Sequence, residues 1–323
     1  MKYVQVITTG GTIASLPTPD GDVAATLSGQ DLLARLGIKE DIKIKSSVTI
    51  NSFNFDYATL YTVAKDVIEA LKKPEIKGVV VTHGTDTIEE TAYYLSLVTS
   101  SYKKPVILTG AQLDPSYPFT DGTKNLQDAI HAADSEKIAN FGTLVVFAGY
   151  VYPARDVQKV DTNALQGFDA PDWGPVARVD NGRVIVTRDI KPTIHLDAVV
   201  PEPVALIRLG IGMTGKELKQ MTEGYRGVVI EAFGRGNAHH TISEEVKLLV
   251  EKQIPVVLTS RCIRGAVLPV YGNGGGKDLE RAGTWFAGDL AGEKARILLG
   301  TMLALGKTWE EMKGIVKREA NHF

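Results

Sequence analysis

A threonine follows two glycines where a short apolar strand ends near the beginning of the chain. Residues 4–7 read as a buried strand, and the glycine pair 10–11 lets the backbone turn sharply and approach a ligand closely. Thr12 stands at that turn, where its hydroxyl can attack a carbonyl carbon if a nearby base takes its proton. Taken alone, such a turn is more often structural or nucleotide-binding.

A second strand, glycine turn and threonine occur in residues 78–95, "GVVVTHGTDTIEETAYYL". Here Thr85 and Asp86 precede a predicted helix, whose N-terminus suits an anion or a developing oxyanion. The structural alternative is that either residue merely caps that helix. Because a parallel sheet brings the carboxyl ends of its strands to one crevice, Thr12 and Thr85 are expected to share a pocket.

Lys159 is the candidate base for these hydroxyls. It lies in "ARDVQKVDT", on a loop after the strand predicted at 142–150. A lysine can take a proton when desolvation or its neighbours make it neutral. Most lysines are simply solvated, so this residue alone decides nothing.

Short β-branched runs alternate with helix-like stretches and must position these residues. The pattern predicts an α/β fold, with a larger N-terminal parallel-sheet three-layer domain plus a smaller C-terminal parallel α/β domain. The predicted domains are 1–190, with a lid loop at 13–30, and 205–323. Three prolines and a loss of helical period mark the linker between them, 191–204.

Composition excludes several classes of function. The 323 residues include 36 Lys and Arg against 38 Asp and Glu, so the net charge of −2 predicts no nucleic-acid or membrane partner. The single cysteine, Cys262, is expected to be packed beside a strand, and its isolation fits a reducing compartment. The start shows no signal peptide, so a cytoplasmic location is expected, with a processed periplasmic form left open. The adjacent pair His239 and His240 lacks metal-ligand spacing, and no metal or cofactor is expected.

Four sequence segments, taken together, resemble the motifs of the bacterial-type L-asparaginase and glutaminase-asparaginase family. The segments are "TTGGTIAS" (8–15), the stretch 78–95, "VILTGAQLDPSYPFTDGTKNLQDAI" (106–130) and "ARDVQKVDT" (154–162). The resemblance implies that Thr12 attacks the side-chain amide of L-asparagine, releasing ammonia and leaving an aspartyl ester. It implies that Thr85, Asp86 and Lys159 form the second catalytic group, which moves protons or activates water.

The resemblance also implies the substrate-binding residues. Asp86 matches the aspartate that holds the substrate ammonium, and Ser52 matches the serine that holds the α-carboxylate with help from the Gly84 backbone. Backbone N–H groups near Thr12, Thr85 and Ala111 are candidates for the oxyanion site. Asn237 matches an asparagine that a neighbouring subunit contributes, which implies a homodimer or homotetramer.

Three departures from the family pattern limit this transfer. Residues 13–30 contain no tyrosine, so the base for Thr12 is open: Tyr271 or Tyr117 reaches in, Lys159 acts through Thr85, or no base is used. Phe53 stands where many members have glutamine, which predicts discrimination against glutamine as a substrate. The segment "LPVYGNGG" offers no carboxylate for the substrate ammonium, and Tyr271 or a water replaces it.

Other functions stay open at the level of sequence. One is a glutaminase-asparaginase or an amino-acid amidase of broader specificity with the same chemistry. Another is a transamidation subunit that passes ammonia to a partner bound to charged tRNA. A third is a non-catalytic small-molecule sensor on the same scaffold.

Overall fold

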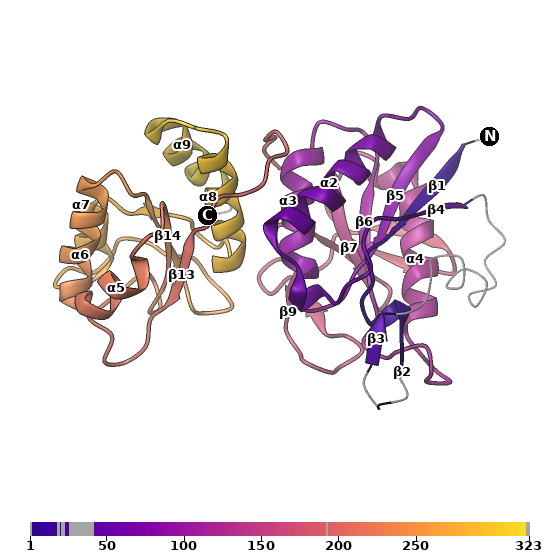
Figure 1. The fold of residues 1–323 in the computed structure, drawn as a ribbon, viewed down its shortest axis with the longest axis horizontal. Coiled ribbons are helices and arrows are strands. Elements are labelled where there is room, and N and C mark those ends of the chain that lie inside the picture. The colour runs from indigo at the N-terminus through magenta and orange to yellow at the C-terminus, as the bar shows by residue number, and fades with distance from the viewer. Residues whose placement is uncertain (1, 18–19, 21–22, 26–41, 192, 321–323) are drawn as a thin grey trace. The chain divides into compact units, whose positions relative to one another are not determined.

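The computed structural model describes residues 2–17, 20, 23–25, 42–191 and 193–320. The chain divides into two compact units, Met1–Ala198 and Val199–Phe323, and each is described by itself (Figure 1). Both units are built from helices packed on a sheet, so the predicted α/β fold class is confirmed.

The first unit contains an eight-stranded mixed sheet. From one edge to the other its strands are β12 (Arg183–Val186), β11 (Ala177–Asp180), β8 (Tyr150–Pro153), β7 (Thr143–Phe147), β6 (Val106–Thr109), β5 (Ile76–Thr82), β1 (Tyr3–Thr8) and β4 (Ile42–Ser46). The strands from β7 to β4 are parallel, and they are rich in β-branched residues because most are covered on both faces.

The sheet departs from a wholly parallel one at β8, β11 and β12, which pair antiparallel. The sequence pattern reads 142–150 as a single strand, whereas the chain reverses there. Ala148 and Gly149 have φ values of 49° and 81°, the two successive positive values that a tight hairpin turn between β7 and β8 requires. An alanine at the first turn position gives little sequence signal for that reversal.

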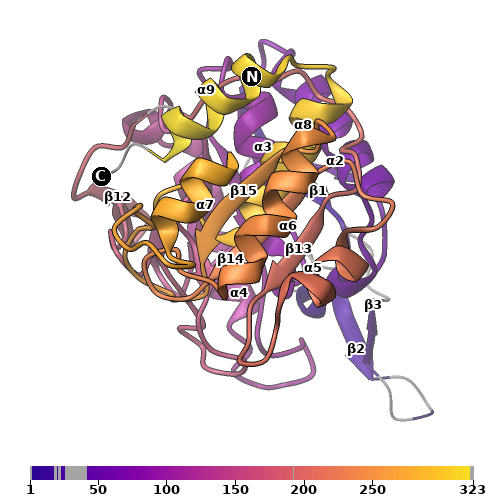
Figure 2. The same ribbon diagram turned by 90° about the vertical axis from the view of Figure 1, so that its left-hand side faces the viewer.

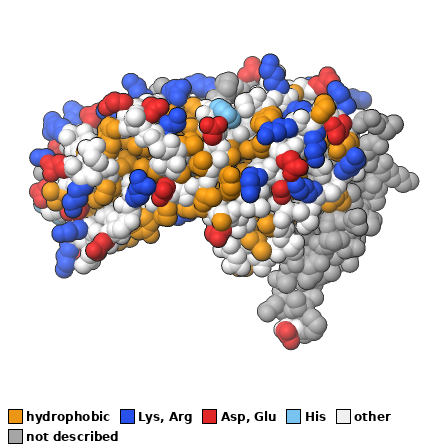
Figure 3. Space-filling view, turned by 45° about the horizontal axis from the view of Figure 1, so that its top comes forward, with side chains coloured by type: hydrophobic (Ala, Val, Ile, Leu, Met, Phe, Trp, Pro, Cys, Tyr) orange, Lys and Arg blue, Asp and Glu red, His pale blue; other side chains and the backbone are white. Residues whose placement is uncertain are grey.

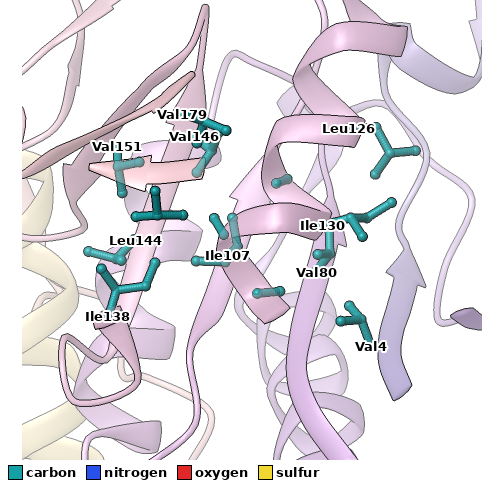
Figure 4. Packing of buried hydrophobic residues seen from close by; sticks show 14 of the residues in the cluster. Val4, Val80, Ile107, Leu126, Ile130, Ile138, Leu144, Val146, Val151 and Val179 are labelled. Carbon is teal, nitrogen blue, oxygen red and sulfur yellow. The ribbon is translucent and has the colours of Figure 1, made fainter. Parts of the chain in front are cut away.

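Helices cover both faces of this sheet (Figure 1). They are α2 (Tyr57–Leu71), α3 (Ile88–Thr99) and α4 (Gly122–Asp134), with 3-10 turns η1 (Thr12–Ala14), η2 (Ser52–Asn54) and η3 (Glu136–Ile138). Leu126 and Ile130 of α4 pack on Val80 and Ile107 of the sheet in one buried cluster (Figure 4). The Asp56 side chain begins α2 by accepting the Thr59 N–H at 2.7 Å, as an N-cap does.

The C-terminal end of α3 fastens the last segment of the first unit. The Leu196 N–H donates to the Leu97 carbonyl at 3.0 Å, and the Ser100 hydroxyl donates to the Ile194 carbonyl at 3.1 Å. The same hydroxyl lies 3.2 Å from Nδ1 of His195. Part of the predicted linker 191–204 is therefore held against a helix.

The second unit is a four-stranded parallel sheet with helices on both faces (Figure 2). Its strands are β13 (Ala205–Arg208), β14 (Val228–Ala232), β15 (Val256–Ser260) and β16 (Trp285–Phe286). Its helices are α5 (Gly215–Thr222), α6 (His240–Glu251), α7 (Gly276–Ala282), α8 (Gly292–Ala304) and α9 (Trp309–Glu319). Capping boxes at Thr214 and Thr308 begin α5 and α9.

The helix-like stretch 28–37 and much of the predicted lid 13–30 lie outside the described residues. The described part of the lid includes a hairpin of β2 (Ser15–Pro17) and β3 (Val23–Ala25). The expectation that Cys262 is packed is wrong: the residue is exposed, because β15 ends at Ser260 and Cys262 lies in the turn beyond it.

The surface agrees with the nearly balanced charge. On the face shown in Figure 3, Lys and Arg side chains are interspersed with Asp and Glu and form no single stripe. No helix within the described part of the chain is long and apolar enough to cross a membrane.

Candidate functional site

The two glycine-threonine turns touch each other. They follow the neighbouring parallel strands β1 and β5, whose last residues, Thr8 and Thr82, are paired in register. A Cβ placed on Gly11 would lie only 2.4 Å from the Gly84 nitrogen, so only glycine lets the two backbones approach this closely. The half-buried Thr12 follows immediately.

The first turn is held by its own neighbours. Gly10 and Gly11 have φ values of 99° and 80°, a region that favours glycine. The Ser15 hydroxyl donates to the Gly11 carbonyl at 2.8 Å, and the Thr9 hydroxyl donates to the Thr82 carbonyl at 2.8 Å. These bonds fix where Thr12 leaves the sheet, and they were not predicted from sequence.

Lys159 lies at the second turn. Its Nζ donates to Thr85 Oγ1 at 2.9 Å and to Asp86 Oδ1 at 2.8 Å. Thr85 is 6% exposed, whereas the Asp86 side chain is 52% exposed. The structure therefore brings together three predicted site residues, with a hydroxyl against an ammonium in a mostly buried place and a carboxylate facing solvent.

The backbone of Lys159 is held as well as its side chain. The residue lies in β9 (Gln158–Lys159), which pairs antiparallel with β10 (Phe168–Asp169). Its N–H donates at 3.0 Å to Oε2 of Glu89, in the first turn of α3. Glu89 was not singled out from the sequence, and no local pattern indicates this long-range contact.

Ser52 and Phe53 lie beside the second turn in η2. Ser52 is buried, and a Cβ placed on Gly84 would come within 2.5 Å of its Oγ. The Thr87 hydroxyl donates to the Ser52 carbonyl at 2.9 Å and ties η2 to the start of α3. Phe53 is 65% exposed, so its side chain is open to solvent within the described part of the chain.

Ala111 follows a third strand end, that of β6, and is buried. A Cβ on Gly110 would lie 2.5 Å from the His83 carbonyl oxygen, which shows that this turn adjoins the Thr85 turn. The buried Asn125 amide donates to the Gly110 carbonyl at 3.0 Å, and its oxygen accepts the Ala148 N–H at 3.0 Å. Asn125 therefore links the turn after β6 to the turn between β7 and β8, and it was not singled out from sequence.

His83 is a buried imidazole immediately before the Thr85 turn. Burial lowers its pKa to about 4, so the ring is neutral at pH 7. Nδ1 lies 2.8 Å from the Gly84 carbonyl oxygen, which can only accept, so Nδ1 carries the proton. Nε2 therefore accepts from the Thr91 hydroxyl at 3.0 Å.

Asn237 and Tyr271 belong to the second unit. Asn237 Oδ1 accepts the Gly276 N–H at 3.3 Å, and the Asn237 backbone bridges to Phe233. The Tyr271 side chain is exposed, and the backbone carbonyl of Tyr271 accepts the Lys277 N–H at 2.8 Å. Their predicted part in a site stays a prediction.

The adjacent histidines have structural roles in the second unit. The His239 side chain accepts from the Thr241 N–H and so caps α6, and the His239 and His240 rings lie 4.2 Å apart. Among the described residues, no group of three or more His, Cys, Asp or Glu side chains could hold a metal ion.

Comparison with known proteins assigns the chain to a family. The family model "Asparaginase, N-terminal" matches residues 3–192, and "Glutaminase/Asparaginase C-terminal domain" matches residues 203–316. The chain belongs to the asparaginase family, as the sequence motifs predicted.

Individual relatives refine the comparison. The chain is 34% identical over 310 residues to the L-asparaginase of Bacillus licheniformis, covering 94% of this chain and 96% of the relative. It is 31% identical to a glutamyl-tRNA(Gln) amidotransferase subunit of Pyrococcus abyssi, covering 97% of this chain and 74% of the relative. A solved structure of the probable cytoplasmic L-asparaginase from Campylobacter jejuni superposes with a TM-score of 0.86 at 27% identity, covering 98% of this chain and 99% of that one.

Proposed function

We propose that the protein hydrolyses the side-chain amide of L-asparagine to L-aspartate and ammonia. The observation that carries this proposal is the contact of Lys159 with Thr85 and Asp86 beside the turn that presents Thr12. It brings a candidate hydroxyl nucleophile, a candidate proton-transfer pair and a solvent-facing carboxylate together on neighbouring loops.

The reaction proceeds in two acyl transfers. Thr12 Oγ attacks the amide carbon, the hydroxyl proton passes to the amide nitrogen, and ammonia leaves behind an aspartyl ester. Water then attacks the ester, gives one proton back to Thr12 Oγ and releases aspartate. In both steps the oxyanion is stabilised by backbone N–H groups near Thr12, Thr85 and Ala111.

The hydrogen bond from Lys159 to Thr85 favours one of the routes left open for activating Thr12. Lys159 Nζ lies 2.9 Å from Thr85 Oγ1, so in its neutral amine form Lys159 would accept the proton that Thr12 passes to the Thr85 hydroxyl. The same pair then activates the water of the second step. Tyr117 and Tyr271 are both exposed, and within the described part of the first unit no contact places the Tyr117 hydroxyl beside Thr12.

Two groups of residues bind the two charged groups of the substrate, its ammonium and its α-carboxylate. Asp86 is the partner for the substrate ammonium, and Ser52 with the Gly84 backbone holds the α-carboxylate. Asn237 and Tyr271 are supplied by a second copy of the chain, which makes the active form a homodimer or homotetramer. We place the enzyme in the cytoplasm and require no metal or cofactor for the reaction.

Phe53 is the basis for a preference for asparagine. It offers a backbone N–H but no side-chain amide, so the longer substrate glutamine gains no extra donor. One methylene of difference in a substrate is worth only about 10- to 200-fold in kcat/KM.

The test is ammonia release by the purified chain from L-asparagine and L-glutamine, each with wild type and Thr12→Ala. The expected result is turnover of asparagine that exceeds turnover of glutamine and is abolished by Thr12→Ala. Equal kcat/KM on both amides would instead favour a glutaminase-asparaginase. Absence of turnover by the chain alone, with ammonia transfer only when an amidotransferase partner and charged tRNA are added, would favour the role named for the Pyrococcus relative.

A further inference from the structure

Lys159 is held at both ends by one short stretch of the chain. Its Nζ bonds Thr85 and Asp86, and its backbone N–H bonds the Glu89 carboxylate at 3.0 Å. These partners lie within residues 85–89, where the turn after β5 passes into α3. Glu89 therefore fixes the Lys159 main chain at a set distance from Thr85, whose hydroxyl Lys159 Nζ contacts.

The strand that carries Lys159 gives weak support by itself. β9 has two residues and pairs only with the two residues of β10, with Lys159 opposite Phe168. Isolated two-stranded pairings are marginally stable. A bond to α3 adds a firmer anchor, because every residue of α3 from Thr91 to Thr99 is buried.

The lysine side chain has several rotatable bonds, so the position of its backbone decides how often Nζ meets Thr85. A displacement of about 1 Å in a catalytic group can cost about 100-fold in rate. Fixing the main chain of Lys159 to the helix that begins beside Thr85 removes such displacement. The cost of ordering this long side chain is then met during folding instead of at each turnover.

We propose that Glu89 is a positioning residue for Lys159, acting through the hydrogen bond from the Lys159 N–H to its carboxylate. This proposal rests on the proposed function, in which Lys159 and Thr85 transfer protons. Glu89 touches no reacting atom in this assignment. Its contribution depends on reach and on an acceptor oxygen, not on net charge.

A competing explanation is that Glu89 only stabilises α3, because acidic residues in a first helical turn interact favourably with the helix dipole. Two conservative substitutions separate reach from charge. Glu89→Gln keeps an acceptor oxygen at the same reach and removes the charge. Glu89→Asp keeps the charge and withdraws the oxygens by about 1.5 Å, the length of one carbon–carbon bond.

The experiment measures kcat and KM for L-asparagine in wild type, Glu89→Gln, Glu89→Asp and Glu89→Ala, with melting curves to check folding. We expect Glu89→Gln to stay within about 5-fold of the wild-type kcat, and Glu89→Asp and Glu89→Ala to lose about 10- to 100-fold. The matched control is Glu310→Gln, an exposed glutamate in the first turn of α9, which should leave kcat unchanged.

The outcomes are distinct from those of the proposed function. Turnover of asparagine by wild type, lost in Lys159→Met, supports the reaction itself; no turnover by wild type overturns the reaction and the role of Glu89 with it. If the reaction holds, a wild-type kcat in Glu89→Asp, or a loss in Glu89→Gln as large as in Glu89→Ala, overturns the positioning role alone. Should Glu89→Ala fail to fold, the Gln and Asp variants still decide the question.

Discussion

The turns that present Thr12 and Thr85 begin from neighbouring strands but lead into different structures. Thr85 is buried, bonds Lys159, and stands before α3, a helix of 12 residues packed into the unit. Thr12 is half-buried and begins η1, a 3-10 turn of only three residues. Similar glycine-threonine sequences thus give one hydroxyl, that of Thr85, held by a hydrogen bond, and another, that of Thr12, at an accessible turn. The first suits a proton-transfer group and the second suits a nucleophile.

The largest expected effect tests this division of roles. Thr12→Ala removes the proposed nucleophile and should lower kcat by about 10³-fold or more, with no covalent adduct. Thr85→Val retains Thr12 but removes the hydroxyl proposed to relay protons in both steps, so kcat should also fall, while any aspartyl adduct should still form on Thr12. Acid quenching and intact-protein mass measurement detect the adduct. An adduct in Thr12→Ala, or on another residue in Thr85→Val, would assign the nucleophile elsewhere.

The next largest effect is the loss of stability on substituting a glycine, which should be greater in the first turn than in the second. Gly11→Ala combines a positive φ of 80° with a Cβ 2.4 Å from backbone, and should cost about 3–5 kcal/mol of unfolding free energy. Gly84→Ala has no positive φ and meets the Ser52 side chain at 2.5 Å, so it should cost about 1–3 kcal/mol. Urea unfolding measures both. A larger loss for Gly84→Ala would mean that the first turn can relax.

The neutral histidine before Thr85 makes the second turn sensitive to acid. Its pKa is about 4 in the folded chain and about 6.5 when exposed, so the unfolded chain binds a proton first as pH falls. As pH falls from about 6.5 to 4, protonation of the unfolded chain therefore lowers the free energy of unfolding progressively, by about 3 kcal/mol in all. At pH 7 and above this group lowers it by almost nothing.

Urea unfolding of wild type and His83→Gln at pH 7 and at pH 4 isolates this contribution from that of the carboxylates. The wild type should lose more stability than the variant across this range. Equal losses in the two proteins would show that His83 does not carry the effect.

The smallest expected effect concerns the partner of that histidine. Thr91→Val removes the hydroxyl that donates to His83 Nε2 and leaves a buried acceptor unsatisfied, at a cost of about 1–3 kcal/mol. The control is Thr62→Val in α2, whose hydroxyl is exposed enough for water to replace the bond; it should change stability by less than about 0.5 kcal/mol. Equal values in urea unfolding would contradict a special role for Thr91.

The strands and turns that form the site could be predicted from the sequence better than the long-range hydrogen bonds that hold them together. Apolar runs such as 78–82 and the glycine-threonine turns located the strand ends, because burial on both faces leaves a local pattern. The antiparallel strands after Phe147 were missed, since the reversal depends on a positive φ at an alanine. The contacts of Glu89 with Lys159 and of Asn125 with Gly110 were also missed, because they join positions 70 and 15 residues apart and leave no periodic trace.

The helix α3 connects two separate places in the first unit. Its N-terminal end adjoins Thr85, and its C-terminal end holds residues 194–196 through Leu97 and Ser100. Twelve residues of helix form a stiff beam of about 18 Å. Residues 194–196 and the Thr85 turn are therefore attached to opposite ends of one rigid element, which fixes the distance between them.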